Sequence, residues 1–117
     1  MLNSHSILVI GGTGMLGEPV ARSLCADGYQ VRVFTRTPDK SRAKFGVDYE
    51  IVAGNIEDRL SLDAALKGCW GVHINLDGGA DPDLERRGVE NIAHSAVKAG
   101  IERISYISGA SVREENC

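Results

Sequence analysis

The sequence ILVIGGTGMLG at residues 7–17 decides the fold. It begins with a short apolar run rich in β-branched side chains, passes through Gly11, Gly14 and Gly17, and leads into a helical pattern. Glycines at this spacing let the backbone turn sharply and approach a ligand, and they let the helix lie close to the strand. The free amides and the dipole of the helix start attract an anion. The stretch therefore predicts a strand, a pyrophosphate-binding turn and a helix.

Two alternatives to a dinucleotide site follow from the same glycines. The phosphate loop of nucleoside triphosphatases is excluded, because no Gly-Lys-Ser/Thr sequence follows. A turn of an α/β protein that binds nothing stays open, because glycine-rich turns occur in many loops. A second strand pattern begins at residue 31, which is the distance that a βαβ dinucleotide-binding unit requires. This context favours the dinucleotide.

The chain has 117 residues, enough for one domain and one core but short for a complete two-part enzyme. Its formal net charge of -3 provides no general attraction to nucleic acid or to an anionic membrane. No apolar run is long enough to span a membrane and the start lacks a secretory signal, so we expect a cytoplasmic protein. The cysteines lack a C-x-x-C pair and the histidines lack metal-ligand spacing, which predicts free thiols and no metal site.

Strand and helix patterns alternate along the whole chain. Further strands are expected at residues 30–35, 49–53, 71–76 and 103–108, and helices at residues 14–27, 38–43, 60–66 and 82–99. Asp81 is the expected cap of the last helix and Gly100 its stop. This alternation predicts an α/β fold, a doubly wound parallel sheet with strand order 3-2-1-4-5, in a single domain over residues 1–117. The ligand crevice is then expected at the carboxyl ends of the first and fourth strands, where the order reverses.

This topology makes predictions about burial. The first two helices should cover the first three strands on one face, and the other two helices the opposite face. The fourth and fifth strands would then have a bare apolar face exposing some of Val72, Ile74, Leu76, Ile104, Tyr106 and Ile107. Because monomers seldom expose such a patch, we expect a homo-oligomer in which a second copy covers it. The expected buried stripe of the last helix is Leu84, Val89, Ile92, Ala93, Ala96 and Val97.

Motifs from end to end of the chain resemble the atypical short-chain dehydrogenase/reductases. They are GGTGMLG, VRVFTR, VAGNIED and AGIERISYISGAS, and they are most similar to the NmrA-like and NAD(P)H-binding, sugar epimerase-like branch. The resemblance implies a Rossmann domain that binds NAD(P)(H), in families that hold reductases, isomerases and non-catalytic redox sensors. Family members continue past the fifth strand into a substrate-binding part. We therefore expect this chain to be an amino-terminal portion, truncated after the fifth strand.

The resemblance also implies which residues bind the cofactor. Asn55 and Ile56 match the adenine position, although Asn55 has an alternative interpretation as a turn-forming residue. Asn75 and Leu76 should lie beside the nicotinamide-side ribose. Ser108 matches a position of a catalytic Ser or Thr, and its alternative is simply the end of a strand. The pyrophosphate would be held by the loop of Gly11, Gly12, Thr13, Gly14, Met15, Leu16 and Gly17.

Cofactor preference depends on the end of the second strand. An acidic residue about 20 residues past the glycines would bind the ribose 2′-hydroxyl of NAD. This chain has Thr35 and Arg36 there instead, so a 2′-phosphate would meet a cation and no carboxylate. NADP(H) is therefore favoured over NAD(H). The basic residues between Lys40 and Lys44 have the alternative of a solvated helix face.

The catalytic pair Tyr-x-x-x-Lys is absent. In short-chain dehydrogenases the lysine lowers the pKa of the tyrosine, which then acts as acid or base. Four residues after the tyrosines at positions 29, 49 and 106 stand Val33, Ala53 and Ala110. No catalytic residue is predicted, and whether the protein is an enzyme stays open. Three functions remain: a catalytically incomplete NAD(P)(H)-binding domain, an NADPH-dependent reductase or isomerase whose substrate part is missing or supplied in trans, and a redox sensor acting through a protein partner.

Overall fold

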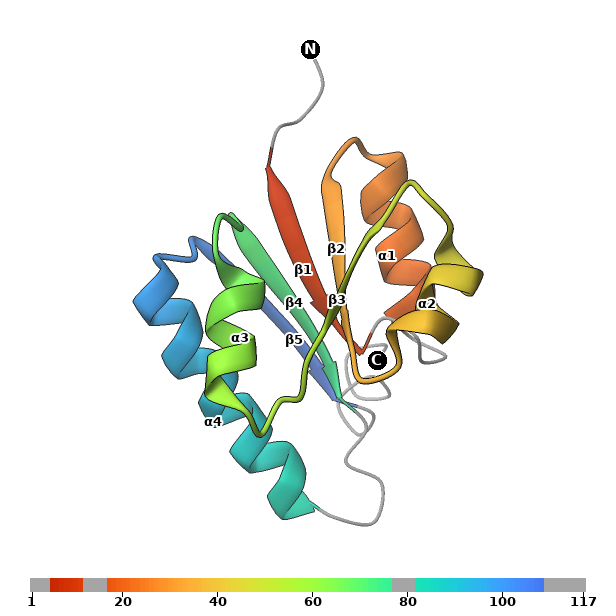
Figure 1. The fold of residues 1–117 in the computed structure, drawn as a ribbon. Helices are drawn as coiled ribbons and strands as arrows, with labels where there is room; N and C mark the ends of the chain where they lie inside the picture. Colours follow the sequence, from red (N-terminus) through yellow and green to blue (C-terminus); the bar gives the residue numbers. More distant parts are fainter. Residues whose placement is uncertain (1–4, 12–16, 77–81, 109–117) are drawn as a thin grey trace, which may run out of the picture.

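The computed structural model describes residues 5–11, 17–76 and 82–108. Its parallel sheet has five strands in the order β3-β2-β1-β4-β5, which confirms the predicted fold class (Figure 1). The strands are β1 (Ser6–Ile10), β2 (Gln30–Thr35), β3 (Glu50–Ala53), β4 (Gly71–Leu76) and β5 (Arg103–Ser108). The helices are α1 (Gly17–Ala26), α2 (Pro38–Phe45), α3 (Arg59–Leu66) and α4 (Pro82–Ala99). The predicted cap Asp81 lies outside the described residues.

Alternating side chains of the strands build a hydrophobic core on each face of the sheet. Leu8 and Ile10 of β1 contribute to the core beneath α3 and α4, and Ile7 and Val9 contribute to the core beneath α1 and α2. Figure 1 shows the two helix pairs on opposite sides of the sheet. Because both faces are covered around β1, the four apolar side chains from Ile7 to Ile10 are almost fully buried.

The helix boundaries follow local signals, but the predicted buried stripe of α4 was partly wrong. Ile92 and Ala96 are fully buried, as expected, whereas Val97 is 78% exposed and Ala93 is also exposed. The row that packs inward contains Gly88, Ile92, Ser95 and Ala96. Residues 92, 95 and 96 lie on one helix face, which turns positions 93 and 97 toward solvent.

The predicted bare apolar face of β4 and β5 was also wrong where it can be checked. Val72 and Ile74 are each 2% exposed, because they point into the core beneath α3 and α4. Their neighbours His73 and Asn75 point to the opposite face, and His73 pairs there with Ser105 of β5. Ile104 is 48% exposed but pairs with Val72 and so lies on the helix-covered face. The side chains of Leu76, Tyr106 and Ile107 lie outside the described part of the chain. Of the three described members of the predicted patch, one, Ile104, is substantially exposed, so they give the apolar argument for a second copy little support.

Three further observations concern the described residues only. None of their helices is both long and apolar enough to cross a membrane. No cluster of His, Cys, Asp and Glu side chains among them has the geometry of a metal site. Cys25 and Cys69 are free thiols, with Cys69 buried and Cys25 partly buried against the α1 core.

Candidate dinucleotide-binding site

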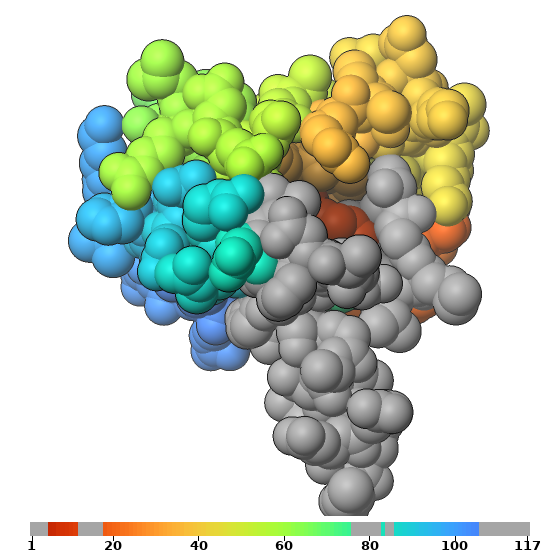
Figure 2. Space-filling model, turned by 90° about the horizontal axis from the view of Figure 1, so that it is seen from below, coloured from red at the N-terminus to blue at the C-terminus, as the bar shows by residue number. Residues whose placement is uncertain are grey.

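The carboxyl ends of β1 and β4 meet where the strand order reverses. Gly11 follows β1 with a φ of +86°, a conformation that favours glycine, and a Cβ at this position would collide with the carbonyl oxygen of Asn75 on β4. Figure 2 views the molecule from this end, and β1 is visible between α3 and α4 on one side and α2 on the other. In parallel sheets of this kind, ligands bind in the crevice outside these strand ends.

The glycine turn is described only at its two ends. Gly12, Thr13, Gly14, Met15 and Leu16 lie outside the described residues, and Gly17 opens α1. Glu18 in the first turn of α1 is paired with Lys44 at 3.0 Å and with Arg22 at 2.9 Å. Hydrogen bonds from Lys44 and Arg22 lower the pKa of Glu18. Its negative charge is thus paired with side chains of α1 and α2.

The turn after β2 presents Arg36 to solvent. The buried Thr35 hydroxyl accepts a hydrogen bond from the backbone N–H of Thr37 at 3.0 Å, which orders the turn. Arg36 is exposed between these residues and forms no ion pair with any described carboxylate. The adjacent start of α2 has Pro38 in its first turn and no side-chain cap from Thr37. The Arg36 guanidinium and the uncapped amides at the start of α2 therefore both follow the carboxyl end of β2.

Asn55 is the second residue of the loop between β3 and α3, and its side chain stabilises a turn there. Its Oδ1 accepts from the backbone N–H of Glu57 at 2.9 Å. Its backbone carbonyl accepts from the N–H of Asp58 at 2.9 Å, and Asp58 caps α3 by accepting from Leu60 N–H at 3.1 Å. These bonds support the turn-forming interpretation of Asn55. Within the part of the chain that the structure describes, one lone pair of Oδ1 and both Nδ2 hydrogens are left for a ligand.

Ile56 lies against α4. Its half-buried side chain packs against the core and contacts Gly88, and its carbonyl accepts from Asn91 Nδ2 at 3.0 Å. The backbone N–H of Ile56 donates to no acceptor in the described part of the chain. Sequence reasoning missed Gly88 and Asn91. A glycine in the interior of a helix, where it lowers stability, was the one available signal of a close contact there.

The carboxyl ends of β4 and β5 lie at the same edge of the sheet as the loops that follow β1, β2 and β3. Asn75 is 9% exposed and contacts Gly11 through its carbonyl, and Leu76 is aligned with Ser108 in the register of the two strands. The side chains of Leu76 and Ser108 lie outside the described residues. The structure therefore brings Gly11 and Asn75 into contact. It places Arg36, Asn55, Leu76 and Ser108 at the carboxyl edge of the same sheet.

One titratable side chain is buried behind this edge. His73 lies two residues before Asn75 on β4, is 6% exposed, and its Nδ1 is 3.1 Å from Ser105 Oγ. Its Nε2 is buried without a hydrogen-bond partner among the described residues. Burial lowers the pKa of His73, so the imidazole is neutral at neutral pH. His73 lies three residues before Leu76, the last residue of β4.

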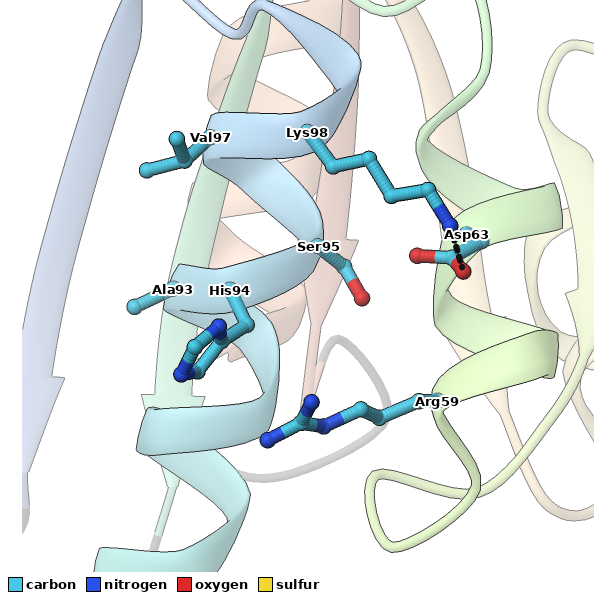
Figure 3. Close-up of a pocket in the computed structure, with 7 residues that line it drawn as sticks. All are labelled: Arg59, Asp63, Ala93, His94, Ser95, Val97 and Lys98. Carbon is cyan, nitrogen blue, oxygen red and sulfur yellow. Dashed lines mark hydrogen bonds and ion pairs between the residues drawn. The ribbon is translucent and has the colours of Figure 1, made fainter.

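A second concave surface lies along the contact between α3 and α4 (Figure 3). Lys98 and Asp63 form an ion pair across it at 3.2 Å, and Arg59 projects from the start of α3 toward α4. Its other lining residues are Ala93, His94, Ser95 and Val97. None of these residues belongs to a strand end, so this groove is distinct from the crevice.

A doubly wound parallel sheet with a glycine turn at the reversal of strand order defines a dinucleotide-binding domain of the Rossmann type. A family model described as NAD(P)H-binding matches residues 11–116, so the chain belongs to this NAD(P)H-binding family. The resemblance to NmrA-like, atypical short-chain dehydrogenase/reductases is confirmed by the relatives.

The relatives are much longer than this chain. It is 36% identical to a (4-alkanoyl-5-oxo-2,5-dihydrofuran-3-yl)methyl phosphate reductase of Streptomyces griseus, with 92% of this chain and 36% of the relative covered. It is 35% identical to an NmrA-like family domain-containing oxidoreductase of Aspergillus hancockii, with 92% and 35% covered. The Citrobacter sp. triphenylmethane reductase, solved with NADP(H), superimposes with a TM-score of 0.78 at 27% identity, covering 86% of this chain and 36% of that one. The chain thus spans about a third of the length of these proteins.

Proposed function

We propose that this chain is an NADP(H)-preferring dinucleotide-binding domain that is catalytically incomplete as it stands. The observation that carries the proposal is the carboxyl edge of the sheet, where Gly11 packs on Asn75 and Arg36 stands exposed without a described carboxylate partner. The pyrophosphate would bind over the loop from Gly11 to Gly17 and the start of α1. The nicotinamide half would lie beside Asn75, Leu76 and Ser108.

Arg36 supports the preference for NADP(H). A ribose 2′-phosphate at the end of β2 would meet the Arg36 guanidinium and the uncapped amides at the start of α2. No acidic side chain occupies the position that would bind the 2′-hydroxyl of NAD. The similar triphenylmethane reductase was solved with NADP(H), which agrees with this preference.

The loop after β3 offers adenine a matching pair of groups. Adenine carries a donor, its 6-amino group, next to an acceptor, N1. The second lone pair of Asn55 Oδ1 would supply an acceptor, and the Ile56 N–H, which has no acceptor among the described residues, would supply a donor. We propose that these two groups bind the adenine edge.

The alternative function is an NADPH-dependent reductase or isomerase whose substrate part is missing here or supplied in trans. The reductase and oxidoreductase names of the similar proteins favour it over a regulatory role. Hydride transfer would then be the chemistry of the cofactor, with this chain positioning it. A redox sensor, the third candidate, requires unequal affinities for NADP and NADPH, so measuring both affinities separates it from the others.

Fluorescence titration with NADPH and NADH tests the proposed function. We expect saturable binding of both dinucleotides, with NADPH tighter. If neither NADPH nor NADH binds at millimolar concentration, the proposed dinucleotide-binding function is refuted. Oxidation of NADPH with a panel of quinones and carbonyl compounds tests the enzymatic alternative.

A homo-oligomer and a cytoplasmic location stay predictions. Sedimentation of the protein as a monodisperse monomer would refute the homo-oligomer.

A further inference from the structure

One peptide plane in the β3–α3 loop is hydrogen-bonded at both ends. The peptide between Ile56 and Glu57 presents its carbonyl to Asn91 Nδ2 of α4 at 3.0 Å and its N–H to Asn55 Oδ1 at 2.9 Å. Asn91 therefore contacts the same peptide that orients the side chain of Asn55. Because the C=O and N–H of a trans peptide point in opposite directions within its plane, the two bonds hold the peptide at both ends, and it cannot rotate without breaking them.

Asn91 is itself held in place. Its Oδ1 accepts from Arg59 Nε at 3.0 Å, so its amide group bridges the first turn of α3 and the preceding loop. This acceptor role of Oδ1 directs Nδ2 toward the Ile56 carbonyl, because the carboxamide is planar. The carboxamide thereby links α3, α4 and the loop.

Gly88, one turn before Asn91, lets the loop approach α4. A Cβ on Gly88 would collide with the side chain of Ile56. Ile56 is β-branched and has few rotamers with which to avoid such a contact. Arg87 adds an ion pair to Glu57 at 3.3 Å, with both side chains about half exposed, so its contribution is small. The close contact and the Asn91 bonds thus fix the loop from the side of α4.

We propose that Asn91, assisted by Gly88, is a positioning residue that makes the β3–α3 loop selective for adenine. By holding the 56–57 peptide, it fixes the free lone pair of Asn55 Oδ1 and the Ile56 N–H in the spacing that matches the adenine edge. Hypoxanthine presents a carbonyl and an N1–H at the same edge, which reverses both hydrogen bonds. This inference rests on the proposed dinucleotide function.

The test compares the affinities for NADPH and for its hypoxanthine analogue, reduced nicotinamide hypoxanthine dinucleotide phosphate. Asn91→Asp keeps the acceptor for Arg59 and loses the donor to Ile56. Asp63→Asn is the matched control, because it breaks the Lys98 ion pair between α3 and α4 without touching the loop. We expect the unchanged protein and the control to prefer adenine about 10-fold or more, and Asn91→Asp to reduce this preference to about 3-fold or less.

Gly88→Ala is the second variant, in case Asn91→Asp does not fold. The higher helix propensity of alanine, worth about 1 kcal/mol, offsets part of the cost of the collision, so the variant should fold with a lowered melting temperature while the displaced Ile56 lowers the adenine preference. A general loss of stability would weaken both dinucleotides equally and leave their ratio unchanged. Full adenine preference in the folded variants overturns the positioning role, and so does equal binding of both dinucleotides by the unchanged protein. Failure of the unchanged protein to bind either one overturns the proposed function instead.

Discussion

Gly11→Ala places a methyl group where β1 and β4 meet, and its cost can be separated into two parts. A non-glycine residue in the left-handed region costs about 1–2 kcal/mol, of which about 0.4–1 kcal/mol is regained because alanine restricts the unfolded chain. At Gly11 the new Cβ also collides with the Asn75 carbonyl oxygen, and relieving such overpacking costs a further ~1–3 kcal/mol. We expect Gly11→Ala to lower the free energy of unfolding by about 1–5 kcal/mol.

Gly100→Ala is the matched control for this substitution. Gly100 has a φ of +75°, close to that of Gly11, but a Cβ there would have no atom within 4 Å. It should therefore show only the backbone cost, about 1.5 kcal/mol or less. Urea unfolding followed by circular dichroism gives both values. Equal destabilisation by the two substitutions would refute the contact between Gly11 and Asn75 as the reason for glycine at this turn.

Three further predictions concern other residues. Arg36→Glu should weaken NADPH binding about 10–100-fold in a fluorescence titration and leave NADH binding nearly unchanged, because a charge-assisted hydrogen bond is worth about 1.5–3 kcal/mol. Arg42→Glu on the exposed side of α2 is its control, and equal effects of the two substitutions would contradict the role of Arg36. Burial lowers the pKa of His73 from its usual 6.5, so the folded state binds fewer protons than the unfolded state below that pH. The contribution of His73 to the free energy of unfolding should be fully present above pH 6.5 and should fall in more acid solution with a slope of up to about 1.4 kcal/mol per pH unit. His73→Gln should remove this part of the pH dependence, whereas His94→Gln, at an exposed position, should keep it. Arg32, whose side chain is 17% exposed, donates at 2.6 and 2.9 Å to carbonyls at the end of α3. Replacing it with Met should cost about 1–3 kcal/mol in urea unfolding, and a change below ~0.5 kcal/mol would show that water satisfies these carbonyls.

The strand order and most element boundaries could be predicted because they depend on local patterns. The alternation of Val31 and Val33 marks β2, and Gly100 with a φ of +75° ends α4 as its sequence position indicated. The reversal between β1 and β4 follows from the alternation of strands and helices and the handedness of their crossovers. Arg36 was identified because its position is set by its distance from the glycine turn.

Burial on the outer elements could not be predicted in the same way. An apolar pattern does not state how far a helix is rotated, so Ala93 and Val97 were placed in the core although both are exposed. Likewise, Val72 and Ile74 were named among six residues of which some would lie on a bare face, because the sequence does not say which face of β4 each residue occupies. Asn91 was missed because its bond to Ile56 joins positions 35 residues apart in the chain. Such a contact leaves no periodic signal.

The most direct measurement is calorimetric titration of the purified protein with NADPH and with NADH. The carboxyl edge of the sheet predicts one-to-one binding of NADPH at micromolar concentrations, with NADH weaker by about 10-fold or more because it lacks the phosphate that Arg36 would bind. No heat of binding for either dinucleotide up to millimolar concentrations would contradict the central claim that this crevice is a dinucleotide site.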